Sequence, residues 1–214
     1  MSDFFIRAGV TMETLEAMRD MRSSFTPSAD DTPLPKSYLR LSEGDTLKIG
    51  ANEWEIIVGT GHSPEHVCLY CKELRVFISG DQILPVITSN VSVHPTEPLA
   101  NPLLGWMDSH LKLMALIPND TLILPAHNEP FYGVRLRLQQ LIDHHEDRMQ
   151  IVLDQCVTPK KAIDLLPHLF ERKLEDHAIF MALGEGIAHI HFLEAKGRIR
   201  KTRQDEHFLY QTIQ

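Results

Sequence analysis

Two histidines and one aspartate near the middle of the chain have side chains that could bind a metal. His62 lies in the segment Gly-His-Ser-Pro-Glu-His, Asp81 follows Ser-Gly, and His127 follows Pro-Ala. Each one comes where a strand is predicted to end, so all three could point from one sheet edge into a common site. Imidazole and carboxylate together suit a catalytic zinc that keeps an open position for water. The pattern therefore indicates a candidate catalytic zinc site.

Strand signals surround these three positions and are separated by turns rich in glycine, asparagine, aspartate and lysine. A helix is predicted from Pro102 to about Ile117, with Asn101 as its N-cap, because proline favours the first helical position. The sequence therefore predicts one mainly antiparallel sheet over residues 38–128, flanked by helices. The predicted strands are Tyr38–Leu41, Thr46–Ile49, Glu53–Val58, Val67–Cys71, Arg75–Ile78 and Thr121–Leu124.

Helical patterns precede and follow this sheet. An amphipathic helix is predicted over residues 11–25, and the proline-rich residues 26–36 are predicted to form a loop. The region after Gly133 predicts three helices and a terminal hairpin, which together are typical of a winged-helix-like module. We therefore expect two domains, at 1–132 and 133–214. The later elements are Val134–Val157, a helix beginning at Thr158-Pro159, Glu175–Lys196, and the hairpin strands Arg198–Lys201 and Phe208–Thr212.

The composition narrows the class of protein. The hydrophobic content of 43% and the charged content of 23% are ordinary for a globular protein. A net charge of −8 argues against nucleic-acid binding, which needs a cationic surface. No apolar run of the roughly 18–20 residues that span a bilayer is evident, and the first residues lack the pattern of a secretory signal. We predict a cytoplasmic protein without a nucleic-acid or membrane partner.

Other potential ligands have local patterns that argue against metal binding. Cys68 and Cys71 lie three positions apart in a predicted strand, where their side chains face opposite sides, so we expect buried small hydrophobic residues. His189 and His191 lie two positions apart in a predicted helix, where they diverge by about 200°. The adjacent pair His144-His145 also diverges.

The three segments around the candidate ligands, in this order, resemble motifs of the metallo-β-lactamase-fold hydrolase superfamily. Gly61–His66 is similar to its Gly-His-[Ser/Thr]-x-x-His motif, Gly80-Asp81 to its Gly-Asp motif and Ala126-His127 to its final histidine motif. The resemblance covers about residues 38–214. It implies an α/β fold, the αββα metallo-β-lactamase-like sandwich, followed by the helical module. The family's His-x-His-x-Asp-His motif normally precedes the region of His62, and residues 1–61 contain no histidine, so we expect the N-terminal half of the sandwich to be absent.

The resemblance also implies roles for individual residues. His62 would complete one metal site and His127 the other, while Asp81 would bridge two zinc ions and orient the nucleophile as the catalytic residue. Only three of seven family ligands are present, so we expect partial or no zinc occupancy. His66, Asn90 and His94 are weaker candidates for contacts with substrate.

Two functional hypotheses follow from these residues. In the first, the protein is a hydrolase that cleaves a small-molecule ester, thioester or amide through a zinc-bound water. In the second, it is an inactive remnant or an interaction module that binds a partner through a sheet face or the helical tail. A sheet without its partner sheet would expose an apolar face. A longer protein, a degenerate relative and an association that covers this face, including a homo-oligomer, all remain open.

Overall fold

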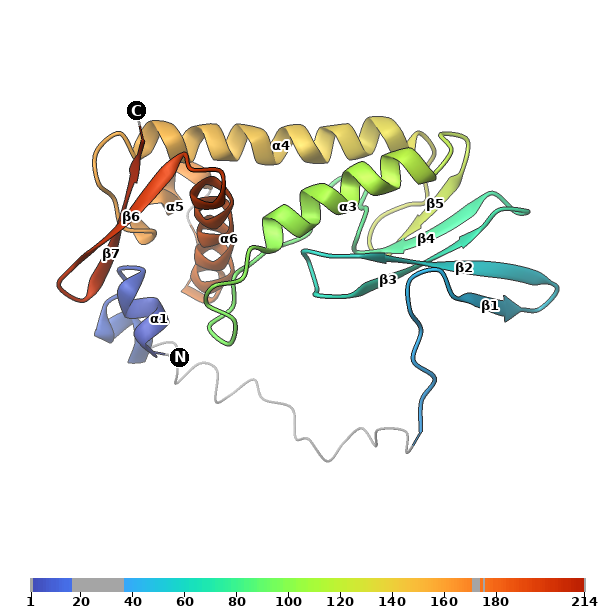
Figure 1. The fold of residues 1–214 in the computed structure, drawn as a ribbon, viewed down its shortest axis with the longest axis horizontal. Helices are drawn as coiled ribbons and strands as arrows, with labels where there is room; N and C mark the ends of the chain where they lie inside the picture. Colours follow the sequence, from blue (N-terminus) through green and yellow to red (C-terminus); the bar gives the residue numbers. More distant parts are fainter. Residues whose placement is uncertain (1, 17–36, 171–173, 175, 214) are drawn as a thin grey trace.

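A five-stranded sheet and a cluster of helices form the structure, a computed structural model that describes residues 2–16, 37–170, 174 and 176–213 (Figure 1). Four antiparallel strands precede a helical crossover to the fifth strand, and the remaining helices and a hairpin follow. The elements are α1 (Ser2–Arg7), β1 (Thr46–Ile49), β2 (Asn52–Gly59), β3 (His66–Cys71), β4 (Val76–Gly80), α3 (Pro102–Leu116), β5 (Leu122–Pro125), α4 (Val134–Gln155), the 3₁₀ turn η1 (Ile163–Leu165), α5 (Leu166–Leu169), α6 (Asp176–Ala195), β6 (Ile199–Gln204) and β7 (His207–Thr212).

The sheet has the order β1-β2-β3-β4-β5, so each strand pairs with its neighbour in sequence. The pairs from β1 to β4 are antiparallel, whereas β4 and β5 are parallel, with Ile78 opposite Leu124. Parallel neighbours need a crossover connection, and α3 provides it. The Asn101 side chain accepts a hydrogen bond from the Leu104 amide and caps this helix, with proline at the first position. The predicted α/β class and the mainly antiparallel sheet are confirmed.

One face of the sheet packs against α3 and α4, which lie over the same side of the strands in Figure 1. Alternate residues of a strand point to opposite faces, so this packing selects one set of side chains from each strand. Cys68 belongs to the covered set, and burial raises the pKa of its thiol to about 12. Cys71 is also buried, and both cysteines occupy interior positions as predicted. The core on this face contains Ile57, Cys68, Tyr70, Phe77, Ile123, Leu113, Ile117, Leu138 and Leu141.

The opposite face of the sheet is less well covered. Val67 is 38% exposed, and Leu69, Ile78, Leu122 and Leu124 are only partly buried. Within the described ranges, no helix packs on this side of the strands in Figure 1. The expectation of an apolar sheet face that is not fully buried therefore agrees with the structure.

A second core joins the helices to the hairpin and to the first residues of the chain. Phe5 of α1 packs in this core with residues of α6, and Tyr210 of β7 belongs to the same cluster. Helix α4 contributes to both cores, through Leu138 to the sheet and through Val152 to this second cluster. The division at 132/133 stays a prediction, and so does the winged-helix character of the C-terminal module.

Two predicted elements are wrong. Residues 38–41 form no strand, and Tyr38 is 86% exposed, because this segment does not pair with the sheet. No helix begins at Thr158-Pro159, because the Lys160 backbone exchanges two hydrogen bonds with Tyr210 of β7, at 3.0 and 2.8 Å. The chain turns helical only at Ile163. The helix predicted over 11–25 is helical at residues 12–16, and its remainder and the loop 26–36 lie outside the described residues.

Helix α6 corrects a further expectation. Among the residues that the structure describes, its segment Ala178–Ala195 is long and apolar enough to cross a membrane by length and composition. This differs from the expectation that the chain contains no such run. More than half of the segment is buried within the structure, as in the core helix of a globular fold, so the finding is weak evidence for a membrane span.

Gly61 is predicted to be essential for packing the sheet against α3. Its φ of +112° disfavours a side chain, and an added Cβ would lie 2.5 Å from the Cβ and 2.9 Å from the Cα of Trp106. We expect Gly61→Ala to lower the free energy of unfolding by about 2–4 kcal/mol, combining backbone strain and overpacking. Gly44→Ala is the matched control, because Gly44 also has a positive φ but faces open space. Urea denaturation of both variants measures the two losses in free energy of unfolding. Equal losses would show that Trp106 moves aside and that the close contact costs little.

Candidate active site

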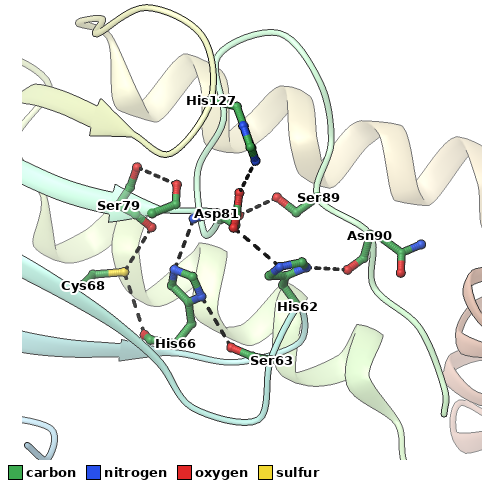
Figure 2. A network of polar contacts seen from close by, with 10 residues as sticks. His62, Ser63, His66, Cys68, Ser79, Asp81, Ser89, Asn90 and His127 are labelled. Carbon is green, nitrogen blue, oxygen red and sulfur yellow. Dashed lines mark hydrogen bonds and ion pairs between the residues drawn. The ribbon is translucent and has the colours of Figure 1, made fainter. Parts of the chain in front are cut away.

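The three candidate ligands converge at one edge of the sheet (Figure 2). The Nε2 atom of His62 lies 3.7 Å from Oδ2 of Asp81, and Nε2 of His127 lies 3.4 Å from Oδ1 of the same carboxylate. The side chains of His62 and Asp81 are 32% and 28% exposed, whereas that of His127 is 62% exposed. One carboxylate therefore faces two imidazole rings, one on each oxygen, at a solvent-accessible position.

Strand pairing explains this convergence. Strands β4 and β5 run parallel, so their carboxyl ends meet at one edge, and Asp81 and His127 follow shortly after those ends. Strand β2 ends and β3 begins at this same edge, where Gly59 pairs with His66, and the connection between them contains His62. Residues far apart in sequence thus lie together because the sheet places them there.

A hydrogen bond determines which nitrogen of His62 carries the hydrogen. The Nδ1 atom lies 2.8 Å from the backbone oxygen of Asn90, and because a carbonyl only accepts, Nδ1 must donate. In the neutral ring, the Nε2 lone pair then faces the Asp81 carboxylate. Two acceptors that face each other are stabilised by a cation between them or by protonation of the ring. Metal-binding histidines in proteins are oriented in this way, with the second nitrogen bonded to a carbonyl or carboxylate.

His66 holds the turn that carries Asp81. The amide of Asp81 donates to Nε2 of His66 at 3.2 Å, so the opposite nitrogen carries the hydrogen and faces the Ser63 hydroxyl at 3.4 Å. Burial, followed by the neighbouring His62, lowers the pKa of His66, which favours this neutral form. Gly80 has a φ of +52°, and a side chain on it would collide with the His66 ring. His66 thus positions Asp81, and its contact with substrate stays a prediction.

The loop after β4 encloses the other side of Asp81. The Ser89 hydroxyl donates to the backbone oxygen of Asp81. The Asn90 backbone faces His62, but its side chain points toward α6, where Nδ2 donates to Glu185 at 3.0 Å. His94 is exposed and lies outside the network drawn in Figure 2. The substrate contacts predicted for Asn90 and His94 remain predictions.

Glu185 was not identified from the sequence, although its setting contains a signal. It is an acidic residue between two glycines in a strongly apolar helix. A charge at such a position is costly unless it is paired, so it indicates a specific contact. Burial raises the pKa of this carboxyl to about 7.

The donor types fit a zinc site, whereas the number of donors does not close one. Two imidazole nitrogens and a carboxylate are ordinary zinc ligands, and the His62 orientation presents a lone pair to the site. Separations of 3.4 and 3.7 Å leave room for an ion about 2 Å from each of two neighbouring ligand atoms. Within the described ranges, no three His, Cys, Asp or Glu side chains form a complete metal-binding group. The arrangement is that of a carboxylate shared between two histidines rather than a cage around one ion.

The other histidine pairs lie in helices, as predicted, His144 and His145 in α4 and His189 and His191 in α6. His145 of α4 and His189 of α6 are buried, and their Nδ1 and Nε2 atoms are 3.1 Å apart. Burial lowers the pKa of both rings. His189 donates through Nδ1 to the backbone oxygen of Glu185, and His191 donates to that of Ala100. These bonds give the rings structural roles.

Comparisons with known proteins agree with the fold and with the site's position. A family model described as "Metallo-beta-lactamase superfamily" matches residues 8–127, more than half of the chain. A second, "Metallo-beta-lactamase-like, C-terminal domain", matches residues 149–213. The chain belongs to the metallo-beta-lactamase superfamily. Its residues 149–213, which include the terminal hairpin, are thus similar to the C-terminal domain that the second model describes.

Solved structures extend this superfamily assignment over nearly the whole chain. A beta-lactamase domain protein from Burkholderia ambifaria is 39% identical, with a TM-score of 0.89, and the match covers 98% of this chain and 60% of that one. A metallo-beta-lactamase family protein from Thermus thermophilus is 25% identical, with a TM-score of 0.77 and coverages of 98% and 62%. This superfamily protein therefore spans less than two thirds of either relative.

One curated relative is named as a hydrolase. The hydroxyacylglutathione hydrolase of Cereibacter sphaeroides is 25% identical over 100 residues, which cover 47% of this chain and 36% of that protein. Members of the superfamily usually bind zinc, which agrees with the donor types at the Asp81 site.

The buried histidines predict a loss of stability in acid. Burial lowers the pKa of His110 from 6.5 to about 4, so the unfolded chain binds a proton there before the folded chain does. Stability is therefore present above pH 6.5 and is lost as the pH falls through about 4, by about 3 kcal/mol for this group.

We expect His110→Gln to reduce this pH dependence by about one proton, measured by urea denaturation at about pH 7.5 and about pH 4. His94→Gln is the control, because His94 is exposed. An unchanged slope in His110→Gln would contradict the linkage.

Proposed function

We propose that this protein is a metal-dependent hydrolase in which His62, Asp81 and His127 bind zinc. The observation that carries the proposal is the single carboxylate that faces two imidazoles from separate loops, with His62 oriented by the Asn90 backbone. In this proposal, His62 and His127 belong to two different metal positions, and Asp81 lies between them.

Each residue has a distinct task in the proposed reaction. A bound zinc ion would supply Lewis acidity and would lower the pKa of a water to about 7. Asp81 holds the site together and orients the attacking water through its carboxylate. His66 and Ser89 fix the Asp81 backbone, so the carboxylate does not need to reorganise during the reaction.

The proposed substrate is a small molecule with an ester, thioester or amide bond. The relative named hydroxyacylglutathione hydrolase supports an acyl substrate of this type. Because the chain covers 36% of that relative, the remaining ligands and part of the substrate pocket would come from outside residues 1–214. In this proposal, the protein is cytoplasmic and its two domains divide at 132/133.

A specific observation favours a second candidate function, the binding of a protein partner. Val67 and its neighbours Leu69 and Ile78 form an apolar strip on the sheet face opposite α3 and α4. Exposed apolar patches are typical of interaction sites. In this alternative, the chain binds a partner through that face and has no catalytic role.

Zinc content and hydrolysis test the proposal. We expect residues 1–214 alone to bind zinc weakly, and a protein extended upstream to include any His-x-His-x-Asp-His segment of its gene to bind it stoichiometrically. In the extended protein, Asp81→Ala should remove zinc and lower thioester hydrolysis about a hundredfold or more. His94→Gln is the control and should keep both. Elemental analysis and an assay with an acyl-thioester give the readouts.

The two remaining outcomes each contradict a part of the proposal. Tight, stoichiometric zinc and hydrolysis by residues 1–214, both lost in Asp81→Ala, would show that the three residues suffice. An extended protein that binds no zinc would refute the metal site and favour the partner-binding alternative.

A further inference from the structure

The loop that carries Asn90 packs directly on helix α6. The amide of Val93 donates to the backbone oxygen of Gly184 at 3.0 Å. A side chain at Gly184 would lie 2.9 Å from the Ser92 side chain and 3.0 Å from the Val93 backbone oxygen. Only glycine allows this close approach, and it brings the next residue, Glu185, against the loop.

Glu185 then connects to the candidate ligand through one residue. Its Oε2 accepts a hydrogen bond from Asn90 Nδ2 at 3.0 Å, and the backbone oxygen of Asn90 accepts one from His62 Nδ1 at 2.8 Å. On its other side, the Asn90 Oδ1 accepts from the Ser92 hydroxyl at 2.6 Å. Both ends of the Asn90 amide are therefore occupied, which fixes the direction of the side chain and with it the backbone beside His62.

We propose that Glu185 is a positioning residue of the active site, which acts through Asn90 to hold His62 with its Nε2 lone pair toward Asp81. A role for Glu185 in catalysis rests on the proposed function. The hydrogen bonds from Glu185 through Asn90 to His62 are present in the structure without a metal. It gives helix α6 of the C-terminal module a direct task at a site that strands β2 to β5 otherwise build.

The identity of the residue is consistent with this task. A partly buried carboxyl that accepts a hydrogen bond from one side chain is an expensive way to fill space, since an apolar side chain would pack there without the cost of desolvation. The carboxyl also offers only oxygen acceptors when ionised, so it selects the nitrogen end of the Asn90 amide. The backbone of Glu185 is fixed as well, because Nδ1 of His189 donates to the Glu185 backbone oxygen at 2.8 Å.

The test measures the tautomer of His62 by nitrogen NMR in residues 1–214 without zinc. We expect the Nδ1-protonated form to dominate in the wild type and in Glu185→Gln, whose amide oxygen still accepts from Asn90. In Glu185→Leu the two tautomers should mix, because the Asn90 backbone is released. Glu194→Gln is the control on the same helix, since Glu194 pairs with Lys201 instead, at 3.2 Å.

Asn90→Ala provides a second route if Glu185→Leu does not fold. It removes the side-chain link and keeps the carbonyl that His62 contacts, so it should mix the tautomers as well. An unchanged His62 tautomer in the folded variants would overturn the proposal.

Zinc affinity of the extended protein separates this inference from the proposed function. Glu185→Leu should weaken zinc binding about 10–100-fold, as the loss of residues that orient metal ligands does, and Glu185→Gln should not. If the extended protein binds no zinc but the tautomers shift as expected, the proposed function fails and the positioning role stands. If zinc binds normally in Glu185→Leu and the tautomer is unchanged, the positioning role alone fails.

Discussion

The parallel pairing of β4 with β5 is the constraint on which the rest of the structure depends. Antiparallel neighbours would end at opposite edges, and Asp81 would then lie a full strand length from His127. The parallel arrangement requires a crossover, and α3 makes it while covering the sheet face that contains Phe77 and Ile123. Helix α3 also packs against Gly61 through Trp106. The crossover that brings Asp81 and His127 together therefore also fixes the loop that carries His62.

Precision at the site comes from short polar contacts rather than from the strands. The backbone on both sides of the Asp81 side chain is held, the amide by His66 and the carbonyl by Ser89. His62 is oriented by a backbone oxygen, so its direction depends on where the loop of Asn90 lies. The sheet brings the residues to within a few ångströms, and these contacts set which lone pair faces which atom.

The sequence predicted what depends on local pattern and missed what depends on distant partners. The strands β1 to β4 and the helix at Pro102 follow from alternation, turn residues and a cap, and these signals lie within a few residues of each element. Residues 38–41 have a strand-like composition but no pairing partner. Thr158-Pro159 has the composition of a helix start, but pairing of Lys160 with Tyr210 keeps the next residues extended.

The same distinction between local pattern and distant partners applies to the candidate site. Its three central residues were predictable because each follows a predicted strand and lies in a segment that resembles a family motif. The contact between Asn90 and Glu185 joins positions 95 residues apart, and no local pattern on either side specifies the other.

The hairpin at the end of the structure has a consequence for how the chain is made. His207 donates to the backbone oxygen of Ile6 at 2.8 Å, across 201 positions of sequence. Helix α1 therefore leaves the ribosome long before its partner strand exists. During that interval Phe5 lacks most of the core in which it finally packs, whereas the four antiparallel strands can pair with neighbours already synthesised. Contacts between distant residues slow folding, so we expect α1 to dock last, and chaperones that bind exposed apolar segments would meet it during translation.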